Sequence, residues 1–291
     1  MRLPKFEYFE PETLEEALRL LAEWRERACV LAGGTDVLVK MRNGRLKPGA
    51  VIALERISSL NGIGFDLSKG LTIGAGAKLS DVTSHPDILR YYPAIARAAR
   101  VMANVQVRNM GTIGGNLCNA APSAENAPPL MALGAVVTAA SLEEERRIPL
   151  DDFFKGPGLT AMKPEEIMTS IFVPTPPANS GASYQRISAR CGVDIAAVSV
   201  GAMIIIEDTV CREVRIALGA VAPVPMRALS AEAFLKEKVW SEEFLREAAR
   251  ISADESRPIS DVRASLEFRK QMVAVMTQRA LEEAYGRAIK R

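Results

Sequence analysis

The residues with the clearest capacity for chemistry lie in two glycine-rich segments of this chain. Leu31–Asp36 reads LAGGTD, and Val107–Glu125 reads VRNMGTIGGNLCNAAPSAE, with Gly111, Gly114 and Gly115 close together. Glycine is costly in a fold unless the backbone needs a positive φ or must approach another group closely. Two such bends suit the two faces of one diphosphate, because bare N–H groups can point at its oxygens. The sequence therefore predicts a dinucleotide cofactor, and FAD is the expected one.

Other phosphate-binding motifs are missing from the sequence. No G-x-G-x-x-G follows a first strand with an acid further on, and there is no G-x-x-x-x-G-K-[ST]. The two glycine segments add hydroxyls, Thr35 and Thr112, in place of a lysine. This favours a diphosphate that is held by neutral N–H groups without phosphoryl transfer. Glu125 could accept a hydrogen bond from a ribose or ribityl hydroxyl, or it could be a helix N-terminal acid ahead of Pro128.

Histidine and cysteine usage excludes several kinds of site. His85 is the single histidine, which argues against a histidine triad, a zinc site or a histidine acid/base pair. The four cysteines show neither C-x-x-C nor the spacing of an iron–sulfur or zinc site, and they are expected to be structural thiols: Cys29, Cys118, Cys191 and Cys211. Cys118 is the exception, because its place inside the glycine motif could bring it near the cofactor.

Composition points to an ordinary globular protein. The chain has 291 residues, long enough for two domains, with 37 basic and 35 acidic residues and a net charge of +2. Nothing in this balance suggests nucleic acid. No apolar run approaches the roughly 20 residues of a membrane span, and the N-terminus has no signal-peptide pattern. We expect a cytoplasmic protein with no membrane span.

The elements around the glycine motifs follow from the apolar pattern. Cys29–Ala32 predicts a short buried strand that runs into Gly33–Asp36, and Val37–Met41 predicts a helical turn after it. Such a helix N-terminus is a phosphate site, although a plain strand-to-helix turn has the same pattern. Ala94–Ala103 predicts a helix of small residues, which Asn104–Arg108 connects to the second motif.

A proline-rich segment, Val173–Ser180, predicts the domain boundary, because proline cannot continue a sheet ladder. Before it, Glu143–Arg147 (EEERR) is expected to be a solvated hairpin tip. Beyond it, three strands of a meander are expected at Ala182–Ala189, Ile195–Glu207 and Glu213–Leu218. Helices are expected at Ser230–Lys238, Ser241–Ala253 and Asp261–Tyr285, the last with Val262, Leu266, Val273, Met276 and Ala280 on one face.

Four segments carry a family resemblance over essentially the whole chain. They read VLAGGTDVLVKMR, RNMGTIGGNLCNAAPSAENAPPLMALGA, EEIMTSIFVP and SYQRISARCGVDIAAVSVGA. Together they resemble the FAD-binding subunit of molybdenum hydroxylases, a family that includes the medium subunit of carbon monoxide dehydrogenases and the flavin domain of xanthine dehydrogenases. The resemblance implies an α+β fold in two parts. Residues 1–176 would form a two-lobed, vanillyl-alcohol-oxidase-like (PCMH-type) FAD domain with a break near 55–60. Residues 177–291 would form a CO-dehydrogenase-flavoprotein-like domain with a three-stranded antiparallel sheet and a helical bundle.

The resemblance also implies site residues. Those expected to hold the diphosphate are Ala32, Gly33, Gly34, Thr35 and Asp36 together with Gly111, Thr112, Ile113, Gly114 and Gly115. Asn116 would support the turn, and Glu125 would contact the ribityl or adenosine side. Near the ring system we expect Ile167 or Met168 from the first domain, and Tyr184 and Gln185 from the second. No residue of this chain is predicted to be catalytic or to bind a metal.

What the resemblance implies for function is an electron-transfer flavoprotein subunit with non-covalent FAD. Molybdopterin and [2Fe–2S] clusters would belong to a large and a small partner subunit of a hetero-oligomer. Because this chain lacks a cysteine-rich insertion, no cluster is expected in it. Electrons would pass from the partner clusters to NAD⁺, a quinone or another acceptor, and the substrate stays open. A stand-alone flavin oxidoreductase and a nucleotide-binding assembly module without redox role remain alternatives.

Overall fold

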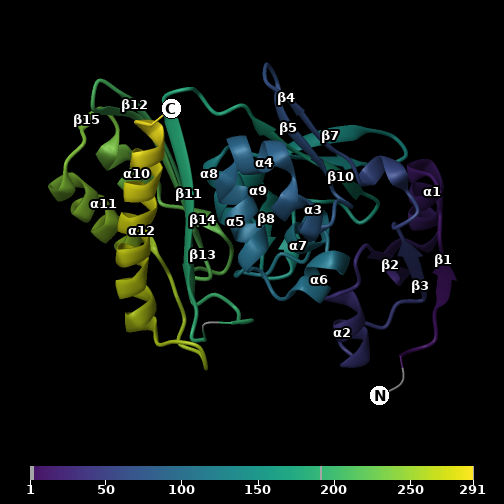
Figure 1. Cartoon of the computed structure of the whole chain (residues 1–291). Coiled ribbons are helices and arrows are strands. Elements are labelled where there is room, and N and C mark those ends of the chain that lie inside the picture. Colours follow the sequence, from purple (N-terminus) through teal and green to yellow (C-terminus); the bar gives the residue numbers. More distant parts are fainter. Residues whose placement is uncertain (1–2, 191, 291) are drawn as a thin grey trace.

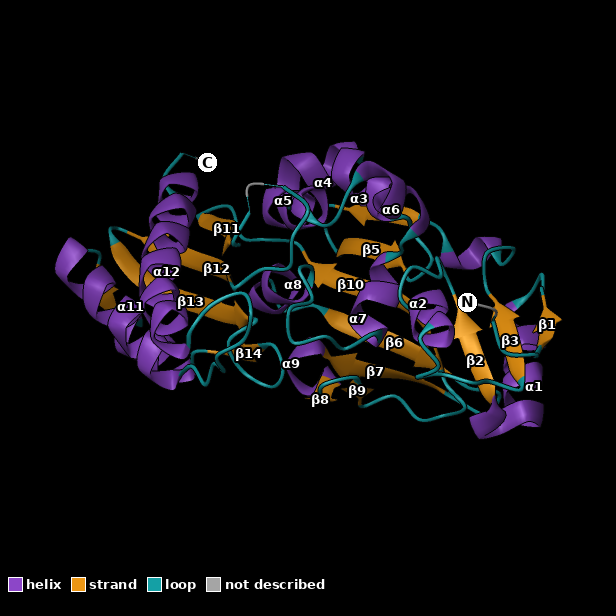
Figure 2. Ribbon diagram, turned by 90° about the horizontal axis from the view of Figure 1, so that it is seen from below, coloured by secondary structure: helices purple, strands orange, loops and turns teal. Residues whose placement is uncertain are grey.

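Three β-sheets follow one another along the molecule (Figures 1 and 2). The computed structural model describes residues 3–190 and 192–290 of the chain. The N-terminal sheet and the sheet of the C-terminal part lie at opposite ends, and the middle sheet lies between them. This mixture of sheets and helices confirms the predicted α+β class.

The first sheet is small and parallel, with the order β1-β3-β2. Its strands are β1 (Glu7–Phe9), β2 (Ala28–Leu31) and β3 (Ala50–Ala53). Helix α1 (Leu14–Trp24) begins after Thr13, whose hydroxyl accepts from the Glu16 N–H at 3.2 Å. Its apolar face packs with Ile52 into one core cluster. Helix α2 (Val37–Arg42) follows β2 after a short loop, and Gly33 of that loop lies against the backbone of Met110 and Gly111.

The middle sheet is antiparallel, with the order β4-β5-β10-β6-β7. Its strands are β4 (Ile63–Asp66), β5 (Gly70–Gly74), β6 (Val136–Ala140), β7 (Glu145–Pro149) and β10 (Ile167–Pro174). Seven helices accompany it: α3 (Leu79–Ser84), α4 (Pro86–Tyr91), α5 (Pro93–Val101), α6 (Val105–Met110), α7 (Ile113–Cys118), α8 (Ala127–Ala132) and α9 (Leu150–Phe153). A small hairpin, β8 (Phe154–Gly156) with β9 (Leu159–Thr160), completes this part. The largest core cluster of the chain lies between these helices and the sheet.

The third sheet is built on three long antiparallel strands, β11 (Ser180–Ile187), β12 (Val198–Glu207) and β13 (Val210–Gly219). Two short strands, β14 (Met226–Arg227) and β15 (Lys238–Val239), extend the predicted three-stranded sheet. Helices α10 (Leu229–Leu235), α11 (Glu242–Glu255) and α12 (Leu266–Ala288) belong to this part (Figure 1). Because side chains alternate along a strand, β12 turns one face to α12 and the other to α8 of the middle part.

The structure corrects several predicted elements. The last helix begins at Leu266 rather than Asp261, so Val262 lies outside it and is 99% exposed. The reason is that Asp261 accepts hydrogen bonds from the Arg263 N–H and from Arg269, which fixes a loop there. Of the predicted tip EEERR, residues 145–147 belong to β7, and the turn itself lies just before them. The connector and the glycine motif form the short helices α6 and α7.

The helices that the structure describes include none with the length and apolar character needed to cross a membrane.

Candidate functional site

A cavity of about 350 Å³ lies between the first sheet and the middle part, and we call it the interlobe cavity. Three parts of the chain form its wall: the end of β2 with the start of α2, the end of β5 with α7, and the segment that enters β10. The lining residues are Val30, Ala32–Val37, Lys40, Leu54, Ala75, Gly76, Leu79, Met102, Gly111, Thr112, Gly114–Asn116, Cys118, Asn119, Thr160, Met162, Lys163 and Glu166–Met168. Both predicted glycine motifs therefore face one cavity.

The first glycine motif presents free backbone donors to this cavity. Within the described part of the chain, none of the N–H groups of residues 33–36 donates to a protein acceptor. Gly34 has φ +72°, a conformation that favours glycine. A Cβ on Gly33 would lie 1.9 Å from the Met110 carbonyl oxygen, so only glycine allows the loop to approach the second motif this closely. Successive unpaired N–H groups in a turn form a concave anion site.

The second glycine motif has a different role, which corrects the prediction that both motifs offer bare N–H groups. The Gly114 N–H donates to the Ala75 carbonyl at 2.9 Å, and the Gly115 N–H donates to the Thr112 hydroxyl at 3.0 Å. A Cβ on Gly114 would lie 2.6 Å from the Ala75 oxygen. These glycines therefore let α7 pack directly on the end of β5, and the motif lines the cavity with its glycines and with Thr112 and Asn116.

The third part of the wall is held by a buried ion pair. Arg146 Nε and Nη2 donate to the Glu166 carboxylate at 2.5 and 2.8 Å, and the Lys163 N–H donates to it at 2.6 Å. Burial alone would raise the pKa of Glu166, but these hydrogen bonds outweigh it and hold the pKa below its usual value. Residues 163–168 are thereby fixed against the cavity.

The charges on the wall include two lysines. Lys40 Nζ donates to Asn119 Oδ1 at 2.6 Å, and Lys163 Nζ pairs with the exposed Glu144 at 2.9 Å. Lys40 and the unpaired N–H groups of residues 33–36 give the cavity donors that fit a diphosphate, whereas the Lys163 ammonium is engaged by Glu144. The donor set thus matches the class of cofactor that the sequence predicts.

Cys118 lies in the cavity wall, with its sulfur 3.8 Å from the Met162 sulfur. The residue as a whole is exposed, but desolvation by the atoms packed around the thiol raises its pKa to about 12. It is therefore a neutral thiol near pH 7 and a poor nucleophile. His85 is remote from this chemistry, because it lies between α3 and α4 and outside the cavity wall. Cys191 lies outside the described residues.

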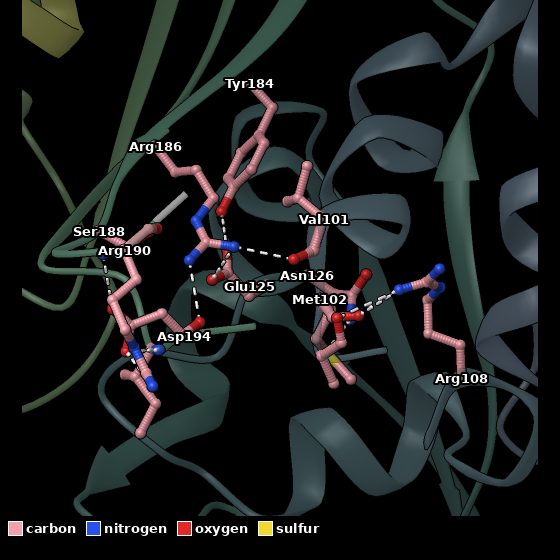
Figure 3. A network of polar contacts seen from close by, with 12 residues as sticks. Val101, Met102, Arg108, Glu125, Asn126, Tyr184, Arg186, Ser188, Arg190 and Asp194 are labelled. Carbon is pink, nitrogen blue, oxygen red and sulfur yellow. Dashed lines mark hydrogen bonds and ion pairs between the residues drawn. The ribbon is translucent and has the colours of Figure 1, made fainter. Parts of the chain in front are cut away.

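Four predicted site residues do not line the cavity. Ile113 is fully buried in the core on the inner face of α7. The Glu125 carboxylate accepts a hydrogen bond from the Tyr184 hydroxyl and lies 3.5 Å from Arg186 Nη1 (Figure 3). Burial raises the pKa of Glu125 although both partners oppose this. Gln185 donates to Glu283 on α12 at 2.6 Å. The contacts of Glu125 with Tyr184 and Arg186 therefore join the two parts of the chain instead of facing the cavity.

Sequence reasoning missed part of the wall. Ala75 and Gly76 belong to TIGAGA, a third glycine-containing cluster, and its glycines could have been recognised as a site of close backbone approach. Lys40, Met162 and Lys163 carry no local signal, because only the folded chain brings them to the cavity.

Two family models together match nearly the whole chain. Residues 4–176 match the FAD binding domain in molybdopterin dehydrogenase, and residues 183–284 match the CO dehydrogenase flavoprotein C-terminal domain. The xanthine dehydrogenase FAD-binding subunit of Escherichia coli O157:H7 is 30% identical over 282 residues, covering 97% of this chain and 96% of that protein. The carbon monoxide dehydrogenase medium chain of Hydrogenophaga pseudoflava is 31% identical over 284 residues, covering 98% of each.

Solved structures agree with these matches. A chain of carbon monoxide dehydrogenase from Hydrogenophaga pseudoflava superposes with a TM-score of 0.95 at 32% identity, covering 99% of both chains. A chain of quinoline 2-oxidoreductase from Pseudomonas putida 86 superposes with a TM-score of 0.91 at 30% identity, covering 99% of this chain and 100% of that one. The interlobe cavity lies wholly within the segment that matches the FAD-binding model. The chain belongs to the family of FAD-binding subunits of molybdopterin dehydrogenases.

Proposed function

We propose that this chain carries FAD in the interlobe cavity and transfers electrons within a molybdenum hydroxylase complex. The observation that carries the proposal is the row of unpaired N–H groups at residues 33–36 on the wall of that cavity. In this proposal these groups hold the diphosphate, with Ala32, Thr35 and Asp36 shaping the loop. Thr112 and Asn116 contribute side chains from the opposite wall, and Gly111, Gly114 and Gly115 keep that wall close.

Ile167 and Met168 line the cavity at the start of β10, and we assign them an apolar contact with the ring system of the cofactor. Bound FAD would supply the redox chemistry, and the chain would supply its position and electrostatic environment. The lining includes no histidine, and its cysteine is a neutral thiol, so we assign no proton-transfer residue among these lining groups.

We place the division between the two domains at residue 176, with a FAD-binding domain before it and a second domain after it. The partners in this proposal are a large molybdopterin subunit and a small subunit with [2Fe–2S] clusters. Electrons would enter from those clusters and leave to an external acceptor. The relatives named medium chain or FAD-binding subunit support this division of tasks, since such names describe one chain of a larger enzyme.

The test compares the isolated chain with the assembled complex. Purified chain should bind one FAD and show the flavin absorption band near about 450 nm, which belongs to the cofactor. In the complex, the substrate of the molybdenum subunit should bleach this band, and in the isolated chain it should not. Bleaching of the isolated chain by substrate would instead indicate a stand-alone flavin oxidoreductase. Failure of the full chain to bind any flavin would contradict the proposal.

A further inference from the structure

The side chain of Asn126 is buried directly behind the cavity wall. It is 0% exposed and lies at the start of α8. Its Nδ2 donates to Asn116 Oδ1 at 2.9 Å and lies 3.7 Å from the Met102 sulfur. Among the described residues, its Oδ1 atom has no hydrogen-bond partner. A buried polar atom without a partner costs free energy, so a residue that keeps one calls for an explanation.

The bond from Asn126 decides which end of the Asn116 amide is available to the cavity. An asparagine side chain carries an acceptor oxygen and a donor nitrogen, and free rotation would present either one. Here the oxygen of Asn116 is occupied by Asn126. Its Nδ2 donates to no acceptor within the described part of the chain, and Asn116 lines the interlobe cavity. The cavity therefore meets a donor, which suits the oxygens of a diphosphate or a hydroxyl group.

The backbone of Asn126 is held in place by its neighbour Glu125. The Glu125 carboxylate is engaged by Tyr184 and Arg186 from β11 (Figure 3). Arg186 also donates to the Val101 carbonyl at 2.8 Å and to the Asp194 carbonyl at 2.9 Å. The side chain of Glu125 thus contacts β11, and the side chain of the next residue, Asn126, contacts Asn116 in the cavity wall.

We propose that Asn126 is a positioning residue that orients the amide of Asn116 toward the cofactor. This inference rests on the proposed function, since it needs a ligand in the interlobe cavity. Asn126 itself lies outside the cavity lining and acts through Asn116. This role explains the unpaired oxygen of Asn126. The side chain is needed for its Nδ2 donor, which holds Asn116, and the same amide group brings with it an oxygen that has no partner among the described residues.

The variant that tests the proposal is Asn126→Leu in the full chain. Leucine has a similar size and removes both the donor and the unpaired acceptor. We expect the dissociation constant for FAD, measured by titrating the apoprotein and following flavin fluorescence, to rise about tenfold, the loss of one oriented hydrogen bond. The melting temperature of the apoprotein should stay the same or rise, because a buried unsatisfied oxygen has been removed. Asn126→Ala serves as a second variant if the first folds poorly.

A double-mutant cycle separates positioning from general destabilisation. In an Asn116→Ala background, Asn126→Leu should cause no further loss of FAD affinity, since the group that it orients is gone. The matched control is Asn179→Leu. Asn179 directly precedes β11, and its half-buried side-chain amide donates to the Ile206 carbonyl of β12 at 2.9 Å. Its FAD affinity should equal that of the wild type.

Three results would overturn the inference while the proposed function stands: wild-type FAD affinity of Asn126→Leu, additive losses in the double variant, or an affinity loss matched by a fall in the apoprotein melting temperature. Two other results would contradict the proposed function itself. If the wild-type chain binds no FAD, or if Gly34→Ala and Asn116→Ala both leave its affinity unchanged, the cavity is not the cofactor site.

Discussion

At the scale of single residues, the two glycine motifs perform different tasks although their sequences look alike. In the first motif, residues 33–36 line the cavity, and within the described part of the chain their four backbone N–H groups donate to no protein acceptor. In the second, Gly114 meets Ala75 so closely that a Cβ has no room. The sequence predicted that both motifs would be near a diphosphate, but it could not assign these roles, because Ala75 lies far away along the chain.

Gly34→Ala tests the donor loop. Gly34 has φ +72°, and an alanine there costs about 1–2 kcal/mol of backbone strain, which the loop relieves by rotating its N–H groups away from the ligand. We expect FAD affinity, measured by fluorescence titration, to fall about 5- to 30-fold, the equivalent of that strain. Gly44→Ala is the matched control, because Gly44 has φ +71° with no atom within 4 Å of the added Cβ. Equal affinity losses in both variants would contradict the assignment of the loop.

At the scale of elements, the segment that enters β10 depends on the pair formed by Arg146 and Glu166. Arg146 comes from β7, which the sequence assigned to a solvated hairpin tip. The charged run gave that reading because periodicity cannot show that one arginine of the run reaches a buried carboxylate across the sheet. β10 is a short apolar segment, Ile167–Pro174, which ends where the proline-rich segment begins.

Glu166→Gln tests this ion pair and its dependence on pH. The pKa of Glu166 is lowered in the fold from 4.5, so its stabilisation is fully present above about pH 4.5 and is lost as pH falls through the lowered value. At pH 7 we expect the variant to lose about 1–3 kcal/mol of unfolding free energy and to release FAD faster. The difference from wild type should shrink as the pH is lowered below 4.5.

Glu144→Gln is the control for that measurement, because it removes an exposed partner of Lys163 and should cost less than about 1 kcal/mol. A difference between Glu166→Gln and wild type that stays constant from pH 7 down to pH 3 would show that the carboxylate charge is not what fixes the segment.

At the scale of the whole molecule, the sheet of the C-terminal part packs on α8 through two glycines. A Cβ on Gly201 would lie 2.4 Å from the Pro128 carbonyl group, and one on Gly219 would lie 2.9 Å from the Pro128 ring. The ion pairs from Asp151 to Arg215 and Arg227 cross the same junction. The pattern of strands and helices predicted both parts of the chain. It did not predict how they pack together, because a glycine in a strand does not indicate which element lies against it.

Gly201→Ala should loosen this junction. The added methyl group meets backbone atoms of α8, and we expect a loss of about 1–3 kcal/mol in denaturant unfolding. The single transition expected of the wild type should separate into two as the parts uncouple. Gly286→Ala in α12 is the control, because its Cβ meets nothing within 4 Å and alanine favours a helix by about 1 kcal/mol. Equal stability of the two variants would contradict the close junction.

A crystal structure of the chain with FAD bound tests the assignment of the interlobe cavity most directly. The diphosphate oxygens should lie about 2.7–3.2 Å from the backbone nitrogens of residues 33–36, the distance of an N–H···O hydrogen bond. The side-chain amide of Asn116 should face the cofactor. A diphosphate bound outside the interlobe cavity, with those four N–H groups left to water, would contradict this assignment.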